Sequence, residues 1–185
     1  MRLFIASSFS PAFTDSVKAV SDYARGNAGR DAVKWVEPDN FHLTYAFLGE
    51  MDAAGAALAR RGMEAGLDGV SAFDICTGGF GAFPSSRRPS VLWVGVGQGA
   101  AELRALASRL AESMTAAGVT YEDRFEPHVT IGRVKHALPE DFVRRVSDFA
   151  AARRAVSRVA SVELVESRLT GDGPVYTPLF SKKLL

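Results

Sequence analysis

The chain carries one short pattern of residues twice: a histidine, an apolar residue and a threonine. The first copy is His42-Leu43-Thr44 and the second is His128-Val129-Thr130. The chain has three histidines, so two of them lie in this frame. Eight of the 185 residues are threonine, and chance would place threonine two positions after two of three histidines in only about 0.5% of such chains. The pair is therefore a candidate site, whereas a single copy is typical of an ordinary strand.

Histidine and threonine two residues apart on a β-strand point to the same face, because successive side chains alternate. Two such strands facing each other would present two imidazoles and two hydroxyls to one cleft. Imidazole titrates near neutral pH, so one ring can take a proton from an attacking water while the other protonates the leaving oxygen. The hydroxyls of Thr44 and Thr130 can donate to non-bridging phosphate oxygens. The pattern favours in-line displacement at phosphorus, a scheme that needs no metal ion.

A zinc site and a phosphate-binding loop are the alternative interpretations of these residues. A catalytic zinc ion takes three protein ligands, but the third histidine, His136, lacks the motif and is typical of a surface residue. The glycine-rich stretch 78–81 lacks the lysine of a P-loop and precedes no clear helix. Its glycines are more typical of a bulge or of a close approach between strands.

Hydrophobic periodicity predicts the elements that must position the motifs. The expected strands are 2–8, 33–36, 41–48, 72–83, 91–96, 128–134, 158–169 and 174–183, the last two joined by a turn at 171–173. The expected helices are 11–25, 53–65, 100–117 and one that opens at 139–141. The segment 84–89, with prolines at both ends, is predicted to be an exposed loop.

The elements that precede the two motifs follow the same order. Strand 2–8 and helix 11–25 precede His42, as strand 91–96 and helix 100–117 precede His128. The side chains outside the motifs differ, so the repeat is one of element order. We predict a duplicated α+β fold with two lobes related by a pseudo-twofold axis. Two antiparallel sheets would face a central cleft with helices outside, and residues 1–185 would form one domain.

The composition limits the class of protein. The chain is 47% hydrophobic and 23% charged, as expected of a globular protein with a real core. No apolar run approaches the roughly 20 residues that span a membrane, and residues 1–6 are more typical of a first strand than of a signal peptide. Cys76 is the only cysteine, which excludes an internal disulfide. The net charge of +1 argues against a protein that coats nucleic acid. We expect a cytoplasmic monomer.

The blocks around the motifs resemble the 2H phosphoesterase superfamily, which is named for two His-x-Thr/Ser motifs in a duplicated α+β fold. Within it they are most similar to the RNA 2′,3′-cyclic phosphodiesterases, also called 2′-5′ RNA ligases. The segments that carry the resemblance are 2–6, 39–44, 47–50, 125–133, 167–169 and 176–179, so it covers nearly the whole chain. Tyr45 and Ile131 stand where leucine is common, a difference that alters packing rather than chemistry.

The resemblance implies opening of a terminal RNA 2′,3′-cyclic phosphate to a 2′-phosphate without a metal ion or another cofactor. His42 and His128 would be the acid–base pair, with His42 assigned as the acid for the 3′ leaving oxygen and His128 as the base. Thr44 and Thr130 would bind the phosphate. The implied partners are RNA ends or nucleotides with a 2′,3′-cyclic phosphate, with no obligate protein partner.

Four further side chains could touch the substrate. By resemblance, Phe47 would stack on the terminal base, although a core aromatic at the end of a strand is equally typical. Arg133 would contact phosphate or nucleotide, but regular alternation puts it on the wrong face unless a twist or bulge at Gly132 brings it round. Arg87 and Arg88 could reach the RNA backbone, although a solvated loop would also explain them.

Other functions are compatible with the same residues. A 2′-5′ RNA ligase acting on tRNA halves would run the same chemistry backwards, with a ribose 5′-hydroxyl as the nucleophile. ADP-ribose cyclic phosphate or small cyclic nucleotides could replace RNA as substrate. A non-catalytic RNA-end or nucleotide-binding module is the alternative from another class. It would need hydroxyls and cations but not two titrating rings, so the paired histidines count against it.

Overall fold

A computed structural model describes residues 1–122, 124–171 and 173–185. Asp172 of the predicted 171–173 turn lies outside them. The strands are β1 (Arg2–Ser7), β2 (Val33–Trp35), β3 (Leu43–Glu50), β4 (Phe73–Ser85), β5 (Arg88–Val96), β6 (His128–Val134), β7 (Val156–Val159), β8 (Ser161–Thr170) and β9 (Gly173–Lys183). The helices are α1 (Pro11–Asn27), α2 (Ala53–Gly66), α3 (Ala100–Ala116) and α4 (Phe142–Ala151), with a 3₁₀ turn at Pro38–Asn40.

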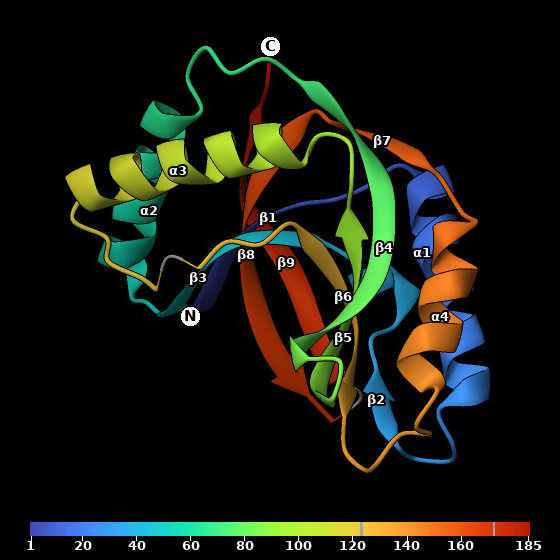
Figure 1. Ribbon diagram of the computed structural model, residues 1–185. Helices are drawn as coiled ribbons and strands as arrows, with labels where there is room; N and C mark the ends of the chain where they lie inside the picture. The colour runs from blue at the N-terminus through green and yellow to red at the C-terminus, as the bar shows by residue number, and fades with distance from the viewer. Residues whose placement is uncertain (123, 172) are drawn as a thin grey trace.

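The strands form two antiparallel sheets (Figure 1). The four-stranded sheet has the order β3-β1-β8-β9, and the five-stranded sheet has the order β2-β6-β5-β4-β7. The motif strand β3 lies beside β1, and the motif strand β6 lies beside β5 in the same way. The order β3-β1-β8-β9 therefore corresponds to β6-β5-β4-β7, with β2 added at the edge of β6. This confirms the predicted duplicated α+β fold.

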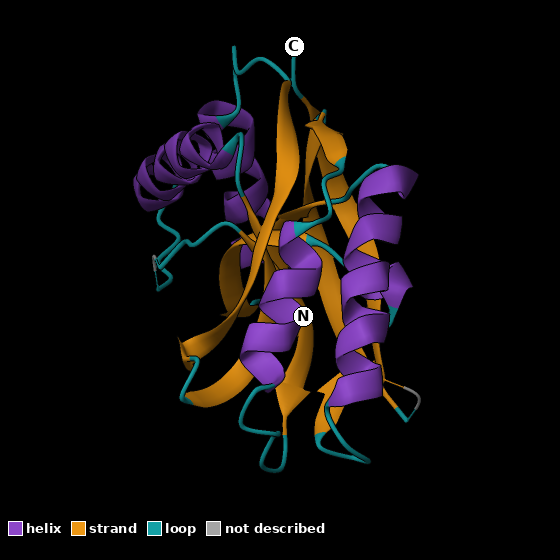
Figure 2. Ribbon diagram, turned by 45° about the vertical axis from the view of Figure 1, so that its right-hand side comes forward, coloured by secondary structure: helices purple, strands orange, loops and turns teal. Residues whose placement is uncertain are grey.

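The helices lie outside the sheets in two pairs, α1 with α4 and α2 with α3 (Figures 1 and 2). The predicted apolar stripe of α1 is buried, and α1 packs on β4, β6 and β7, so the helix that follows β1 crosses over to cover the five-stranded sheet. The Ser10 side chain caps this helix by accepting from the Phe13 N–H. No helix within the described residues is long and apolar enough to cross a membrane.

Two of the three glycines of α2, Gly62 and Gly66, have a packing role. A Cβ at Gly62 would lie 2.8 Å from the sulfur of Met114, and one at Gly66 would overlap the hydroxyl of Ser113. Glycine therefore lets α2 approach α3 closely, although it lowers intrinsic helix propensity. The predicted stripe of α3 (Leu103, Leu106, Ala107, Leu110 and Met114) is buried against this contact.

Two of the predicted elements are wrong. The single strand expected over 158–169 is two strands, because the chain passes at Ala160 from β7 in the five-stranded sheet to β8 in the four-stranded sheet. The loop expected over 84–89 is instead a hairpin with a turn at 86–87, in which Pro84 pairs with Pro89. Neither proline lies opposite a third strand, so their missing N–H groups leave the ladders to β6 and β7 intact.

Candidate active site

Each motif histidine is fixed by the backbone two residues before it. Nδ1 of His42 lies 2.7 Å from the carbonyl oxygen of Asn40, and Nδ1 of His128 lies 2.6 Å from that of Glu126. A carbonyl oxygen can only accept, so Nδ1 donates in both cases, and Nε2 of each ring is left to take or give a proton. The same contact at the same spacing holds both rings in one tautomer and one orientation.

The two rings lie near each other, because β3 contacts β6 and a positive charge on His128 lowers the pKa of His42. Burial is the main cause that lowers the pKa of both histidines below the ordinary value. The residues that alternate with each His and Thr along the two strands are buried, as predicted from strand alternation: Leu43, Tyr45, Val129 and Ile131. The structure thus brings the two copies of the motif to one place.

Aromatic side chains that the sequence did not reveal enclose both histidine rings. His42 lies 4.9 Å from the ring centre of Phe4 and 5.1 Å from that of Tyr176. His128 lies 5.1 Å from the ring of Phe83 and 6.3 Å from that of Trp93. These walls withdraw the imidazoles from water, which explains their lowered pKa values. They come from other strands of the two sheets, β1 and β9 for His42 and β5 and β4 for His128, where nothing in the motif spacing could indicate them.

Trp93 lies flat against Gly81, and this contact gives a structural prediction. A Cβ at Gly81 would overlap the indole ring, so Gly81→Ala is expected to push Trp93 against His128 and to lower the free energy of unfolding by about 1–3 kcal/mol. Gly79→Ala is the matched control, because its Cβ would meet nothing within 4 Å. Urea unfolding of both variants tests this; equal stability of the two would contradict the packing argument.

A bulge in β3 brings Phe47 to the face that carries His42. Thr44 pairs with Ala6 and Phe47 pairs with Phe4, so three residues of β3 span two of β1, and Tyr45 is the extra residue. Phe4 and Ala6 lie on the cleft face of β1, opposite its core residues. The side chain of Phe47 is 65% exposed, which excludes the interpretation of Phe47 as a core aromatic.

An equivalent bulge in β6 brings Arg133 to the face that carries His128. Thr130 pairs with Trp93 and Arg133 pairs with Val91, so Ile131 is the extra residue. Arg133 is exposed. Burial raises the pKa of Tyr176, and the nearby charge of Arg133 lowers it, so Arg133 lies close to the Tyr176 hydroxyl. The bulge beside Gly132 therefore places Arg133 on the same strand face as Thr130. Phe47 and Arg133 are each three residues after their threonine, so they hold equivalent positions.

The third histidine does not join the site. His136 is exposed beyond the end of β6, whereas His128 is at the strand's beginning. Within the described ranges, no three His, Cys, Asp or Glu side chains gather closely enough to hold a metal ion. Arg87 and Arg88 lie at the β4–β5 hairpin turn, at the far end of the five-stranded sheet.

Comparison with known proteins shows the family of this chain. A family model described as the 2′-5′ RNA ligase superfamily matches residues 14–170. The RNA 2′,3′-cyclic phosphodiesterase of Archaeoglobus fulgidus is 37% identical over 183 residues, which cover 97% of this chain and 98% of that protein. The protein of the same name from Aeropyrum pernix is 38% identical over 154 residues, which cover 82% of this chain and 86% of that protein.

Solved structures share the fold over the whole chain. A protein of Thermus thermophilus matches with a TM-score of 0.76 at 25% identity, covering 100% of this chain and 98% of that one. LigT of E. coli, in a crystal structure with 3′-AMP, matches with a TM-score of 0.73 at 24% identity, covering 99% and 97%. The chain belongs to the 2′-5′ RNA ligase superfamily, the 2H phosphoesterases.

Proposed function

We propose that this protein hydrolyses the 2′,3′-cyclic phosphate at the end of an RNA to a 2′-phosphate, using His42 and His128 as an acid–base pair without a metal ion. The observation that carries the proposal is the paired geometry of the two rings, each fixed at Nδ1 by a backbone carbonyl and each with no hydrogen bond from Nε2 to the described residues. The curated relatives named RNA 2′,3′-cyclic phosphodiesterase support the substrate class.

The reaction is a displacement at phosphorus. A neutral histidine accepts a proton at Nε2 from water, whose oxygen forms a bond to phosphorus as the bond to the ribose 3′ oxygen breaks. The other histidine, protonated, gives its Nε2 proton to that 3′ oxygen. The product is a 2′-phosphate beside a free 3′-hydroxyl, and the two histidines have exchanged protonation states. A water molecule from solvent restores them through proton exchange.

The surroundings of the rings favour one assignment of the two roles. The Glu126 carboxylate raises the pKa of His128, whereas the charge of His128 lowers that of His42. His42 is also more deeply enclosed by aromatic rings. Both influences favour a single proton on His128 over one on His42. We assign His42 as the base and His128 as the acid, the reverse of the assignment made from the sequence.

The remaining cleft residues would hold the substrate. The hydroxyls of Thr44 and Thr130 make no hydrogen bond to other described residues, so they are available to the non-bridging phosphate oxygens. Arg133 would neutralise phosphate charge. Phe47 presents an exposed ring on which the terminal base can stack. The partner implied is an RNA end, with no protein partner required.

Product analysis tests the proposed function. An oligonucleotide ending in a 2′,3′-cyclic phosphate is incubated with the protein in excess EDTA, and the products are separated. Conversion to a 2′-phosphate is expected; a 3′-phosphate, or no turnover, would refute the proposal. Adding an RNA half with a free 5′-hydroxyl tests the reverse reaction, because a ligase would form a 2′-5′ junction through the same site.

The dependence of activity on pH is a second test of the acid–base pair. Hydrolysis needs one ring neutral and the other protonated, and both pKa values of the free enzyme are lowered from the ordinary value of about 6.5. A bell-shaped profile of kcat/KM with its maximum below about pH 6.5 is therefore expected. The bound phosphate anion favours protonated rings, so the kcat profile should lie at higher pH. A kcat/KM that rises steadily through neutral pH would contradict this assignment.

A further inference from the structure

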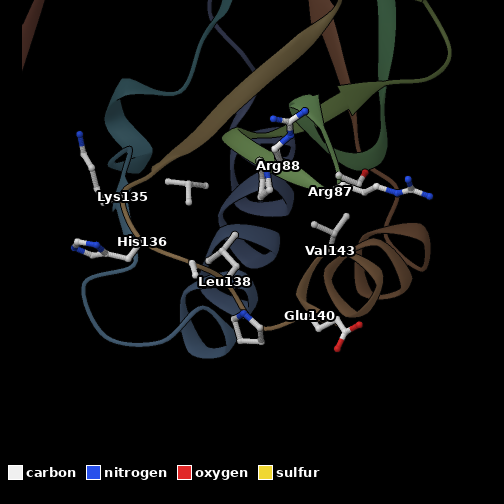
Figure 3. Close-up of a pocket in the computed structure, with 12 residues that line it drawn as sticks. Arg87, Arg88, Lys135, His136, Leu138, Glu140 and Val143 are labelled. Atoms are coloured by element: carbon white, nitrogen blue, oxygen red, sulfur yellow. The ribbon is translucent and has the colours of Figure 1, made fainter.

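A groove of about 630 Å³ lies at the far end of the five-stranded sheet (Figure 3). Its walls are the β4–β5 hairpin, the end of β6 and the beginning of α4. Leu138 and Val143 turn toward its centre, whereas Arg88 and Lys135 are directed away from this apolar floor, both to the same side. The rim that these two cations form has no part in the acid–base chemistry described above.

The register places these cations on the face that carries the active site. Pro89 pairs with Pro84 and Val91 pairs with Phe83, so Ser90 is an extra residue in β5. Because of this bulge, Arg88 returns to the cleft face with Val91. The groove floor, which includes Pro89, is on the other face.

Two further cations lie on this face. Lys34 of β2 pairs with Arg133 of β6, and paired residues share a face. Lys135 comes two residues after Arg133, and its N–H still bonds to the Ala32 carbonyl at 2.8 Å, so the extended chain continues through it. Lys34, Arg88 and Lys135, which we call the basic track, therefore surround the end of β6 that is farther from His128.

The basic track has no ion-pair partner among the described residues. Its three side chains are exposed, and none forms an ion pair or side-chain hydrogen bond within the described part of the chain. Glu140 is the acidic residue that lines the groove, and its carboxylate points outward. Several other exposed cations are paired with a carboxylate, such as Lys18 with Asp22 and Arg158 with Asp74. Unpaired cations on one face attract a polyanion.

We propose that the basic track binds the RNA backbone upstream of the cyclic end, so that the preferred substrate is an RNA chain of several nucleotides rather than a mononucleotide. This rests on the proposed function. β6 has seven residues from His128 to Val134, which at roughly 3.3 Å per residue place Lys135 and Arg88 about 20 Å from the catalytic ring. Lys34 lies beside Arg133, nearer to the ring. A mononucleotide held at His128 does not reach Lys135 or Arg88, but the preceding phosphates of a longer chain do.

The test compares two substrates across three proteins. The substrates are adenosine 2′,3′-cyclic phosphate and a six-nucleotide RNA with the same end. The proteins are the natural chain, the track variant (Arg88→Gln, Lys135→Gln) and a control variant (Lys18→Gln, Arg144→Gln) that removes equal charge from exposed positions on the outer helices. The track variant is expected to lose about tenfold in kcat/KM on the hexamer and less than twofold on the mononucleotide.

Salt dependence gives the same test through binding. The slope of log affinity for the hexamer against log salt should become shallower by about 0.7 for each phosphate contact removed, and the control variant should keep the natural slope. Equal losses on both substrates, equal losses in the control variant, or equally tight binding of an oligoglutamate peptide would overturn the proposal. Absent turnover of both substrates would refute the proposed hydrolysis, while fluorescence anisotropy with the 3′-phosphorylated hexamer would still decide on the track.

Discussion

Alanine at His42 or at His128 is expected to lower kcat by about 10²- to 10⁴-fold, because each ring moves one proton in the same displacement. The double variant should be scarcely worse than either single one, since loss of one ring already disables the concerted transfer. His136→Ala is the matched control: this third histidine is exposed beyond the end of β6 and should keep full activity. The measurement is the single-turnover rate of the four variants on a cyclic-phosphate RNA, compared with the natural protein. A near-natural rate in either motif variant would refute the mechanism.

A substrate with sulfur in place of the 3′ leaving oxygen separates the two roles. A thiolate leaves without being protonated, so the variant that lacks the acid should regain most of its rate on this substrate, while the variant that lacks the base should not. With His128 as the acid, His128→Ala is rescued. Rescue of His42→Ala instead would restore the assignment made from the sequence and would show that phosphate binding, rather than Glu126, decides where the proton lies.

Alternation along a strand was sufficient to predict the pairing of each histidine with its threonine. His42 and Thr44 share a face because the side-chain period is two, and the same rule buries Leu43 and Tyr45. The rule fails for Phe47, because it assumes a regular ladder. The extra residue that follows each threonine changes the phase, and its only trace in the sequence is the equal spacing of three residues from threonine to Phe47 and to Arg133.

Other parts of the site had no signal that the sequence could supply. The carbonyls of Asn40 and Glu126 that orient the rings are backbone atoms, which every residue type provides. Tyr176 reaches His42 from a strand more than 130 positions away, and only the sheet order β3-β1-β8-β9 brings them together. The long hairpin of β4 and β5 was missed because its prolines are typical of a loop. It matters for function, because the hairpin carries Arg88.

Valine at Thr44 or Thr130 is expected to lower kcat/KM by about 10²-fold, because each change keeps the branched shape but removes one donor to the phosphate oxygens. Both threonines are half-buried on the cleft face, opposite Ala6 and Trp93, so the strands should accept valine without unfolding. Serine at either position restores the hydroxyl and should recover most of the activity. Thr115→Val controls for hydroxyl loss alone, since that hydroxyl bonds to the Ala111 carbonyl on α3. Steady-state kinetics decides whether the threonines bind the phosphate or only pack the cleft. If serine and valine lower kcat/KM equally, the threonines pack the cleft rather than bind the phosphate.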